Sequence, residues 1–425
     1  MPRDASWHGP GYEVTRSVSD AVMESAAASV NAPSSRGDAL GNRLKELHRH
    51  LLERFPRIDR IACALYDAGD DLLKTFVDST RSGEPISGHE FCLSESESLR
   101  TMASTGEPRV LDAIQEVVKP VNRHSRWLLD QGYQSSFTVP LFDGREFIGV
   151  LFYDSCAPAA FTPRVQKDLS VFSMLMSMTI NRDMSLVRSM ASSAHVAREF
   201  AALRDFETGG HLERMAHYAR LIAKHLQRDC ALTDEYIEHL YLFAPLHDIG
   251  KIGIPDRILL KPGPLTPAER AVMETHVNKG VVVLQRMLGD FQLDQLPDAD
   301  VMLNVVAAHH ECLDGSGYPN RLSGDAVPLE ARIIAVADVF DALTSQRPYK
   351  DPWSWDEAMA ELRQLVATGK LDHRCVDAIE AHADEVIAIR DRFNDTLAPA
   401  SLADPMGTTT PKPWPRSEGC PVQLR

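Results

Sequence analysis

The sequence predicts a multidomain protein in which an α+β domain is followed by an all-α domain. Its 425 residues exceed the size of one ordinary hydrophobic core, so two or three domains are expected. Short strand patterns lie between residues 60 and 153, and two of them are joined by Asp143-Gly144, a strong hairpin signal. From Ala201 to Asn394 the apolar residues recur instead at helical spacing.

The two ends of the chain differ in composition from the part between them. Residues 1–38 are rich in Ser, Ala, Gly and Pro without a sustained period, which predicts a disordered arm. Residues 395–425 are dense in Pro, Thr and Gly, which predicts a disordered tail.

We place the α+β domain at residues 39–182. The apolar positions from Leu40 to Phe55 predict its first helix, and Pro163–Met178 predicts a closing helix. The strand candidates between these helices are Arg60–Tyr66, Leu72–Val77, Ser136–Phe142 and Glu146–Tyr153. Helices combined with antiparallel strands are typical of a small sensor module.

This domain resembles a GAF domain, most clearly in the segment SSFTVPLFDGREFIGVLFYDS. The resemblance implies a sensor that binds an unknown small molecule, and a dimerisation scaffold without a ligand is the alternative. Acidic and apolar residues dominate the strands, so the sequence identifies no particular ligand.

A linker helix is predicted at residues 183–200. Around it, alternating four- and three-residue steps separate a set of apolar positions: Ile180, Met184, Val187, Ala191 and Ala194. This spacing is that of a coiled-coil seam, which would join two protomers. A helix that packs on its own domain explains the spacing equally well. We expect a homodimer in which the linker couples the sensor to the domain that follows.

The composition limits the compartment and the partners. Seven cysteines without a CxxC motif indicate reduced thiols and a cytoplasmic protein. The longest apolar stretch, Val171–Ile180, is too short to span a bilayer, so no membrane is expected. The net charge of -15 disfavours a long nucleic acid as the partner, because such binding needs a basic surface.

The chemically most informative residues are two pairs in the helical part of the chain. His247-Asp248 ends an apolar run in APLHDIGKIGIPD, and His309-His310 begins HHECLDGSGYP. Imidazoles and carboxylates bind first-row divalent metals. A buried carboxylate at Asp248 needs a metal or a cation beside it. Lys251, four residues after His247, could hold a phosphate oxygen or protonate a leaving oxygen.

Further candidate ligands lie in the same part of the chain. Glu207 and His211 are four residues apart and would share one face of a helix that begins near Gly209-Gly210. His276 lies in a segment predicted as one helix, 268–288, and Asp338 ends the apolar segment ARIIAVADVF.

Five motifs in this order resemble the HD-GYP family of metal-dependent phosphohydrolases: DFETGGHLER, HDIGKIGIPDRILLKPGPLT, HVNKG, HHECLDGSGYP and ADVFDALTSQRPYK. The resemblance covers residues 201–394 and implies an all-helical domain with two or three iron or manganese ions. It implies the metal ligands Glu207, His211, His247, Asp248, His276, His309, His310 and Asp338. It also implies substrate contacts from Lys251, Tyr318, Arg347 and Lys350, and support of the ligands by hydrogen bonds from Asp205. The sequence departs from the family at Cys312-Leu313 and Phe340, and neither departure removes a ligand.

The function implied is hydrolysis of cyclic di-GMP to pGpG, with GMP as a further product. Asp248 would bridge two ions, and Lys251 would stabilise charge on the phosphate. Two alternatives stay open: a cyclic-dinucleotide receptor without activity, and a phosphodiesterase that acts on cyclic GMP-AMP.

Overall fold

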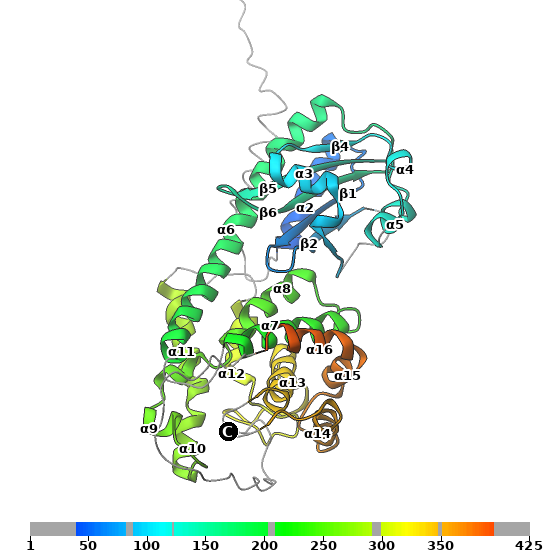
Figure 1. Cartoon of the computed structure of the whole chain (residues 1–425). Helices are drawn as coiled ribbons and strands as arrows, with labels where there is room; N and C mark the ends of the chain where they lie inside the picture. Colours follow the sequence, from blue (N-terminus) through cyan, green and yellow to red (C-terminus); the bar gives the residue numbers. More distant parts are fainter. Residues whose placement is uncertain are drawn as a thin grey trace, which may run out of the picture.

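The computed structural model describes residues 40–81, 88–120, 123–202, 209–290, 299–346 and 351–394. Within these ranges a sheet domain and a helical domain lie end to end, and one long helix runs along both (Figure 1). The predicted multidomain architecture, α+β followed by all-α, is confirmed. The predicted arm at 1–38 and the predicted tail at 395–425 lie outside the described residues.

The sheet domain is built on a six-stranded antiparallel sheet with the order β3-β2-β1-β6-β5-β4. Its strands are β1 (Arg60–Asp67), β2 (Leu72–Thr80), β3 (Glu90–Cys92), β4 (Arg109–Leu111), β5 (Ser135–Asp143) and β6 (Glu146–Ser155). The predicted hairpin is confirmed, because Asp143 pairs with Glu146 and Gly144 turns the chain with a φ of 59°. The two three-residue edge strands, β3 and β4, were not predicted.

Alternating side chains of the central strands form a core on each face of the sheet. One core is covered by α2 (Leu40–Arg54) and α6 (Pro163–Ala202), and it includes Leu47, Ile61 and Phe172. The other is covered by α3 (Glu97–Thr105), which buries Leu99 and Met102 against it. The remaining elements of the sheet domain are η1 (Leu93–Glu95), α4 (Ile114–Val117) and α5 (Arg123–Asp130).

Helix α6 is continuous from the sheet domain into the helical domain (Figure 1). It contacts β5 at one end of its course and α8, η2 and η3 of the helical domain further along. Of the predicted seam, Ile180 and Met184 are buried in the core of their own sheet domain. The side chains of Val187, Ala191 and Ala194 are outside the described set, so a seam between protomers stays a prediction.

The helical domain surrounds α13 (Leu329–Thr344), which is buried along most of its length. Its other longer helices are α7 (Gly209–Leu226), α8 (Asp234–Phe243), α11 (His276–Asp290), α12 (Ala299–Ala308), α14 (Trp355–Ala367), α15 (His373–Ala381) and α16 (Ala383–Arg392). Short elements connect them: η2 (Ala244–Leu246), η3 (Ile249–Gly253), α9 (Asp256–Leu259), α10 (Pro267–Glu274) and η4 (Gly324–Ala326). The helix predicted at 268–288 is in fact two, α10 and α11, and His276 begins the second.

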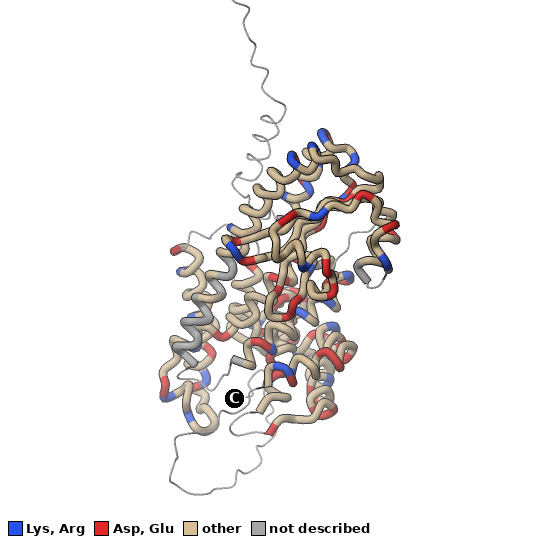
Figure 2. The backbone as a smooth tube through the Cα atoms, turned by 45° about the horizontal axis from the view of Figure 1, so that its top comes forward, with Lys and Arg blue, Asp and Glu red and all other residues tan. Residues whose placement is uncertain are grey.

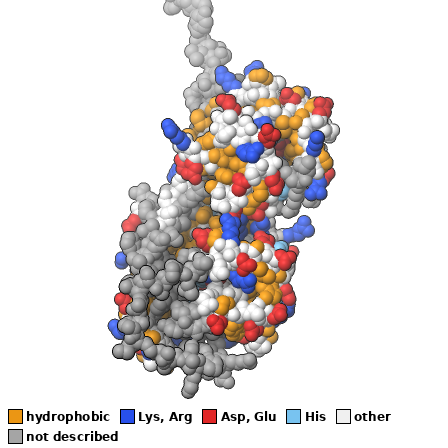
Figure 3. Space-filling model, in the orientation of Figure 1, with side chains coloured by type: hydrophobic (Ala, Val, Ile, Leu, Met, Phe, Trp, Pro, Cys, Tyr) orange, Lys and Arg blue, Asp and Glu red, His pale blue; other side chains and the backbone are white. Residues whose placement is uncertain are grey.

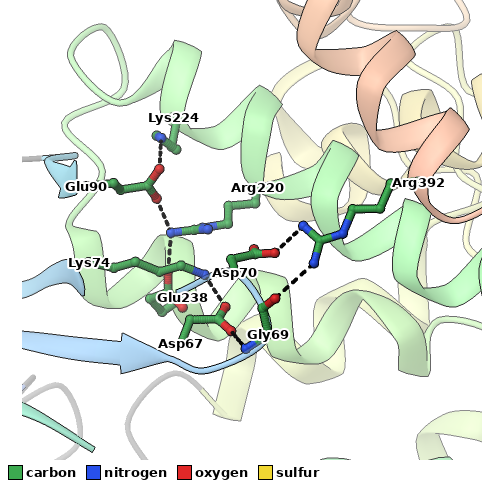
Figure 4. A network of polar contacts seen from close by, with 9 residues as sticks. All are labelled: Asp67, Gly69, Asp70, Lys74, Glu90, Arg220, Lys224, Glu238 and Arg392. Atoms are coloured by element: carbon green, nitrogen blue, oxygen red, sulfur yellow. Dashed lines mark hydrogen bonds and ion pairs between the residues drawn. The ribbon is translucent and has the colours of Figure 1, made fainter. Parts of the chain in front are cut away.

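The two domains meet through charged side chains (Figure 4). Glu90 of β3 lies between two cations of α7: its Oε2 accepts from Lys224 Nζ at 2.9 Å, and its Oε1 pairs with Arg220. At a second contact, Arg392 of α16 pairs with Asp70 and donates to the carbonyl oxygen of Gly69 at 3.0 Å. Acidic and basic side chains both lie along this junction in the space-filling view (Figure 3).

Apolar and backbone contacts complete the junction. The Phe76 ring of β2 packs edge-on against His239 of α8, with 6.3 Å between ring centroids, and Leu242 packs against the core of the sheet domain. The backbone N–H of Gly88 donates to Asp234 Oδ1 at 2.7 Å. The domains are therefore held together by side chains from both sides and by α6.

Both signs of charge are distributed over the two domains (Figure 2). Among the described helices, none combines the length and the hydropathy that a bilayer span needs.

Candidate metal centre

The candidate ligands reach one buried region from five separate elements. His247 and Asp248 lie between η2 and η3, where an apolar run ends. His276 begins α11, and His309-His310 directly follow α12. His211 lies in the first turn of α7, and Asp338 lies in α13. The structure describes α7 from Gly209 onward, so the predicted helix start near the Gly209-Gly210 pair stays a prediction.

The structure brings these side chains together in two groups. In the first, Asp248, His276, His309 and His310 are buried and each offers a ligand atom within 4.8 Å of the others. The second group, with the same spacing, is His211, His247 and Asp338. Of the other predicted site residues, Glu207, Asp205, Arg347 and Lys350 lie outside the described residues.

Backbone carbonyls fix which nitrogen of three histidines faces the site. The Nδ1 atoms of His247, His276 and His309 lie 2.9, 2.8 and 3.0 Å from the carbonyl oxygens of Ala244, Met273 and Val305. A carbonyl only accepts, so the proton is on Nδ1 and the lone pair is on Nε2. These Nε2 atoms are buried and face no hydrogen-bond donor among the described residues; two of them lie close to the oxygens of Asp248, which are themselves acceptors. Such a tautomer is the one that binds a metal.

Asp248 belongs to the first group and also reaches His247 of the second. Its Oδ1 is 3.1 Å from His276 Nε2, and its Oδ2 is 3.2 Å from His247 Nε2. Lys251 pairs with the same Oδ2. Burial alone would raise the pKa of Asp248, but the ammonium group of Lys251 holds it well below its usual range. An ionised carboxylate with its oxygens toward different groups is suited to bridge two ions.

Burial also favours the neutral form of the adjacent histidine pair. It lowers the pKa of His309, and burial together with His309 and His276 lowers the pKa of His310 well below the usual value. Neutral imidazole is the form that donates a lone pair to a metal.

The loop that contains Gly317, Tyr318 and Pro319 (the GYP loop) packs against His310. The backbone N–H of Tyr318 donates to the carbonyl oxygen of His310 at 3.2 Å, and the two rings lie 4.6 Å apart, inclined by 30°. Glu311, which is buried, accepts from the backbone N–H groups of Asn320 and Leu322 at 2.7 and 2.9 Å. The loop is therefore anchored by a carboxylate that the sequence analysis did not single out.

A second carboxylate was also missed. Asp341, one turn after Asp338 on α13, is 1% exposed and lies 2.7 Å from His211 Nδ1. Its position within the apolar run VADVFDALT could have indicated a buried carboxylate, and a buried carboxylate needs a partner.

Comparison with known families agrees with this architecture. The HD domain family matches residues 195–375, and the GAF domain family matches residues 44–180. The chain joins a GAF domain to an HD domain. The resemblance of the HD domain to HD-GYP proteins and of the sheet domain to GAF domains, drawn above from the motifs, is confirmed.

Three curated relatives illustrate the similarity. The chain is 48% identical over 177 residues to the cyclic di-GMP phosphodiesterase response regulator RpfG of Xanthomonas campestris, covering 41% of this chain and 43% of the relative. It is 42% identical over 193 residues to 3'3'-cGAMP-specific phosphodiesterase 2 of Vibrio cholerae, covering 45% and 34%. It is 39% identical over 229 residues to a probable cyclic di-GMP phosphodiesterase of Vibrio cholerae, covering 51% and 49%. The matches span less than half the length of each of these relatives.

The side chains of the HD domain fit divalent metal ions. The donor set is imidazole nitrogen and carboxylate oxygen, which suits first-row transition metals. Among the described residues, no hydrogen-bond donor reaches a set of buried ring nitrogens: the Nε2 atoms of His211, His247, His276 and His309 and the Nδ1 of His310. Buried polar atoms are normally paired, so these nitrogens indicate a bound cation.

Proposed function

We propose that the HD domain hydrolyses cyclic di-GMP to linear pGpG, with GMP as a further product, and uses two or three iron or manganese ions. The observation that carries this proposal is the pair of ligand groups that Asp248 connects, since its two oxygens lie near His276 of the first group and His247 of the second. The names of the relatives, cyclic di-GMP and 3'3'-cGAMP phosphodiesterases, support the substrate class.

The proposed metal ligands are the seven described residues of the two groups, together with Glu207, with Asp205 in support. When bound, the ions supply Lewis acidity that activates water near neutral pH. Asp248 is proposed as a catalytic residue because its carboxylate joins the two ligand groups. Lys251 is proposed as the second, because its ammonium group lies at Asp248 and can hold a phosphate oxygen or donate a proton to the leaving 3′-oxygen.

Substrate contacts are proposed for Lys251, Tyr318, Arg347 and Lys350. The position of Tyr318, whose ring lies against that of His310, supports its part in this proposal. A ring at the edge of the ligand groups can pack against a guanine base while the phosphate reaches the ions.

The test is product analysis with purified, full-length protein loaded anaerobically with Mn²⁺ or Fe²⁺. We expect pGpG from cyclic di-GMP, and we expect Asp248→Ala to lose turnover and bound metal together. Retention of the parent rate by Asp248→Ala would show that the assignment is wrong. Binding of cyclic di-GMP without any product would instead establish the receptor alternative.

A second candidate substrate is 3'3'-cyclic GMP-AMP, which the name of the second relative favours. The same assay with both dinucleotides distinguishes the candidates by their kcat/KM ratio. A tenfold ratio of kcat/KM corresponds to a difference of about 1.4 kcal/mol in transition-state binding, and a larger ratio would identify the preferred substrate.

We further propose that the GAF domain regulates the HD domain, as a sensor for a small molecule, within a homodimer. Helix α6 and the ion pairs of Glu90 and Arg392 support a coupling between the domains. For the dimer, Val187→Glu in the predicted seam is expected to give monomers in light scattering of the full-length chain. An unchanged dimer would remove the seam from the proposal.

The proposed location is the cytoplasm, without a membrane or a long nucleic acid as partner. Cys63, Cys312 and Cys375 are buried free thiols, which supports a reducing compartment.

A further inference from the structure

Asp341 is a buried carboxylate on α13 that belongs to neither ligand group. Its Oδ2 lies 2.7 Å from His211 Nδ1. Its Oδ1 accepts from Arg214 Nε at 2.5 Å, and its Oδ2 also accepts from Arg214 Nη2 at 3.1 Å. The side chain is 1% exposed, so water does not compete for these contacts.

These contacts determine which nitrogen His211 offers to the site. A carboxylate flanked by a guanidinium is ionised and only accepts, so His211 Nδ1 carries the proton. The lone pair is then on Nε2, which is buried without a hydrogen-bond partner among the described residues. His211 offers one ligand atom within 4.8 Å of those of His247 and Asp338, and with Nδ1 engaged this is Nε2.

His211 differs in this respect from the other histidines of the site. His247, His276 and His309 donate from Nδ1 to neutral backbone carbonyls of their own segments. His211 donates to a charged side chain from a different helix. A carboxylate partner makes an imidazole a stronger ligand and holds the plane of its ring.

Arg214 holds the carboxylate in place. It lies one turn after His211 on α7, and it also donates from Nη1 to the carbonyl oxygen of Phe393 at 2.7 Å. His211, Arg214 and Asp341 therefore link α7 to α13, and Arg214 links both to the residue that follows α16.

We propose that Asp341 is a positioning residue for the metal centre, which acts by fixing the tautomer and the orientation of His211. This inference rests on the metal site of the proposed function. It does not depend on the substrate or on turnover, because its test is metal binding alone. The competing explanation is a buried ion pair between Asp341 and Arg214 that only stabilises the fold.

The test compares Asp341→Asn with a matched control, Asp372→Asn, in the full-length protein. Asp372 is likewise buried and pairs with two arginines, Arg332 at 3.3 Å and Arg374 at 2.7 Å, and it belongs to neither ligand group. Each metal-free variant is titrated with Co²⁺, and the visible absorption of bound Co²⁺ and its affinity are measured. Thermal melting of the metal-free proteins reports the loss of stability.

In Asp341→Asn the amide is expected to donate toward His211 Nδ1, because Arg214 engages the oxygen, which places the imidazole proton on Nε2. We expect the affinity for one Co²⁺ to fall by about 10- to 100-fold and its spectrum to change. Asp372→Asn is expected to melt earlier but to keep the parent affinity and spectrum. Parent affinity in Asp341→Asn, or an equal loss in both variants, would overturn the proposal.

A double-mutant cycle provides a second measurement that does not require a large effect. If Asp341 acts through His211, then Asp341→Asn adds no further loss of Co²⁺ affinity in a His211→Ala background. Asp341→Glu, which retains the charge, is expected to recover part of the parent affinity. Additive losses in the cycle would show that Asp341 acts independently of His211 and would refute the proposal.

Discussion

Gly250 of η3 lies against the backbone of His276, so closely that a Cβ atom added at Gly250 would be 1.8 Å from the His276 carbonyl oxygen. The same atom would be 2.4 Å from the backbone nitrogen of Gly280, one turn further along α11. Two backbones therefore touch without side chains between them. This contact places Asp248, two residues before Gly250, at the Nε2 of His276.

Gly250→Ala is expected to separate η3 from α11, because no backbone contact shorter than about 3 Å is tolerated around a real Cβ atom. We expect a loss of about 1–3 kcal/mol in the free energy of unfolding and loss of metal from the site that contains Asp248. Metal analysis and chemical denaturation measure both. The control is Gly289→Ala on α11, whose added Cβ atom meets nothing within 4 Å. Normal metal content in Gly250→Ala would contradict this account.

Lys251→Gln is expected to separate catalysis from metal binding. The ammonium group pairs with Asp248 but is not one of the ligand atoms in either group. We expect bound metal to be retained while kcat falls about 100- to 1,000-fold, as for the loss of one hydrogen-bond donor to a transition state. Lys261→Gln, which removes an ion pair with Glu269 outside both ligand groups, is the control and should keep the parent kcat. An equal loss of bound metal and kcat would show that Lys251 supports metal binding and does not act on the phosphate.

Glu90→Arg is expected to separate the two domains. The substitution removes the carboxylate that pairs with Arg220 and Lys224 and places a third cation beside them. We expect the melting transitions of the two domains to move apart in calorimetry and trypsin to cut between them more rapidly. Glu116→Arg, at an exposed position of α4, should leave both measurements unchanged. A single unaltered transition in Glu90→Arg would show that the ion pairs do not hold the junction.

Asp234 predicts a pH effect on stability. Burial raises its pKa to about 6 from a usual value of 3.8, so the folded chain binds a proton in this interval that the unfolded chain has released. The contribution of Asp234 to stability therefore falls as the pH rises from about 4 to 6 and stays low above 6. The melting temperature of Asp234→Asn minus that of the parent should therefore increase as the pH rises through this range. Asp300→Asn, exposed in the first turn of α12, should show a constant difference.

The sequence predicted the elements that carry their own periodicity. The strands β1, β2, β5 and β6 are runs of eight to ten residues rich in apolar side chains, and they lie where they were expected. The edge strands β3 and β4 have three residues each, so pairing with β2 and β5, and not a local pattern, defines them. Likewise, the break between α10 and α11 at Thr275 interrupts no apolar pattern and was missed.

In the metal centre, histidines next to carboxylates or glycines could be recognised from the sequence because their residue types are rare in apolar segments. Their partners were harder to recognise. Arg214 and Asp341 are separated by 127 positions, and only the packing of α7 on α13 shows that they meet. In the sequence, only a spacing of four residues from His247 places Lys251, and this spacing does not reveal its partner. In the structure Lys251 pairs with Asp248, three residues earlier, because η3 is a 3-10 helix with three residues per turn.

Helix α6 has a mechanical consequence. Its 40 residues, at 1.5 Å each, make a rod about 60 Å long. Ile180 and Met184 of this helix pack into the core of the sheet domain, and the helix also contacts η3 of the helical domain. A slight tilt of the part of α6 that packs on the sheet produces a larger displacement at the other end of the helix, as in a lever arm. The η3 segment at that contact bears Lys251, so we expect an ångström-scale rearrangement around the sheet to shift its ammonium group relative to Asp248.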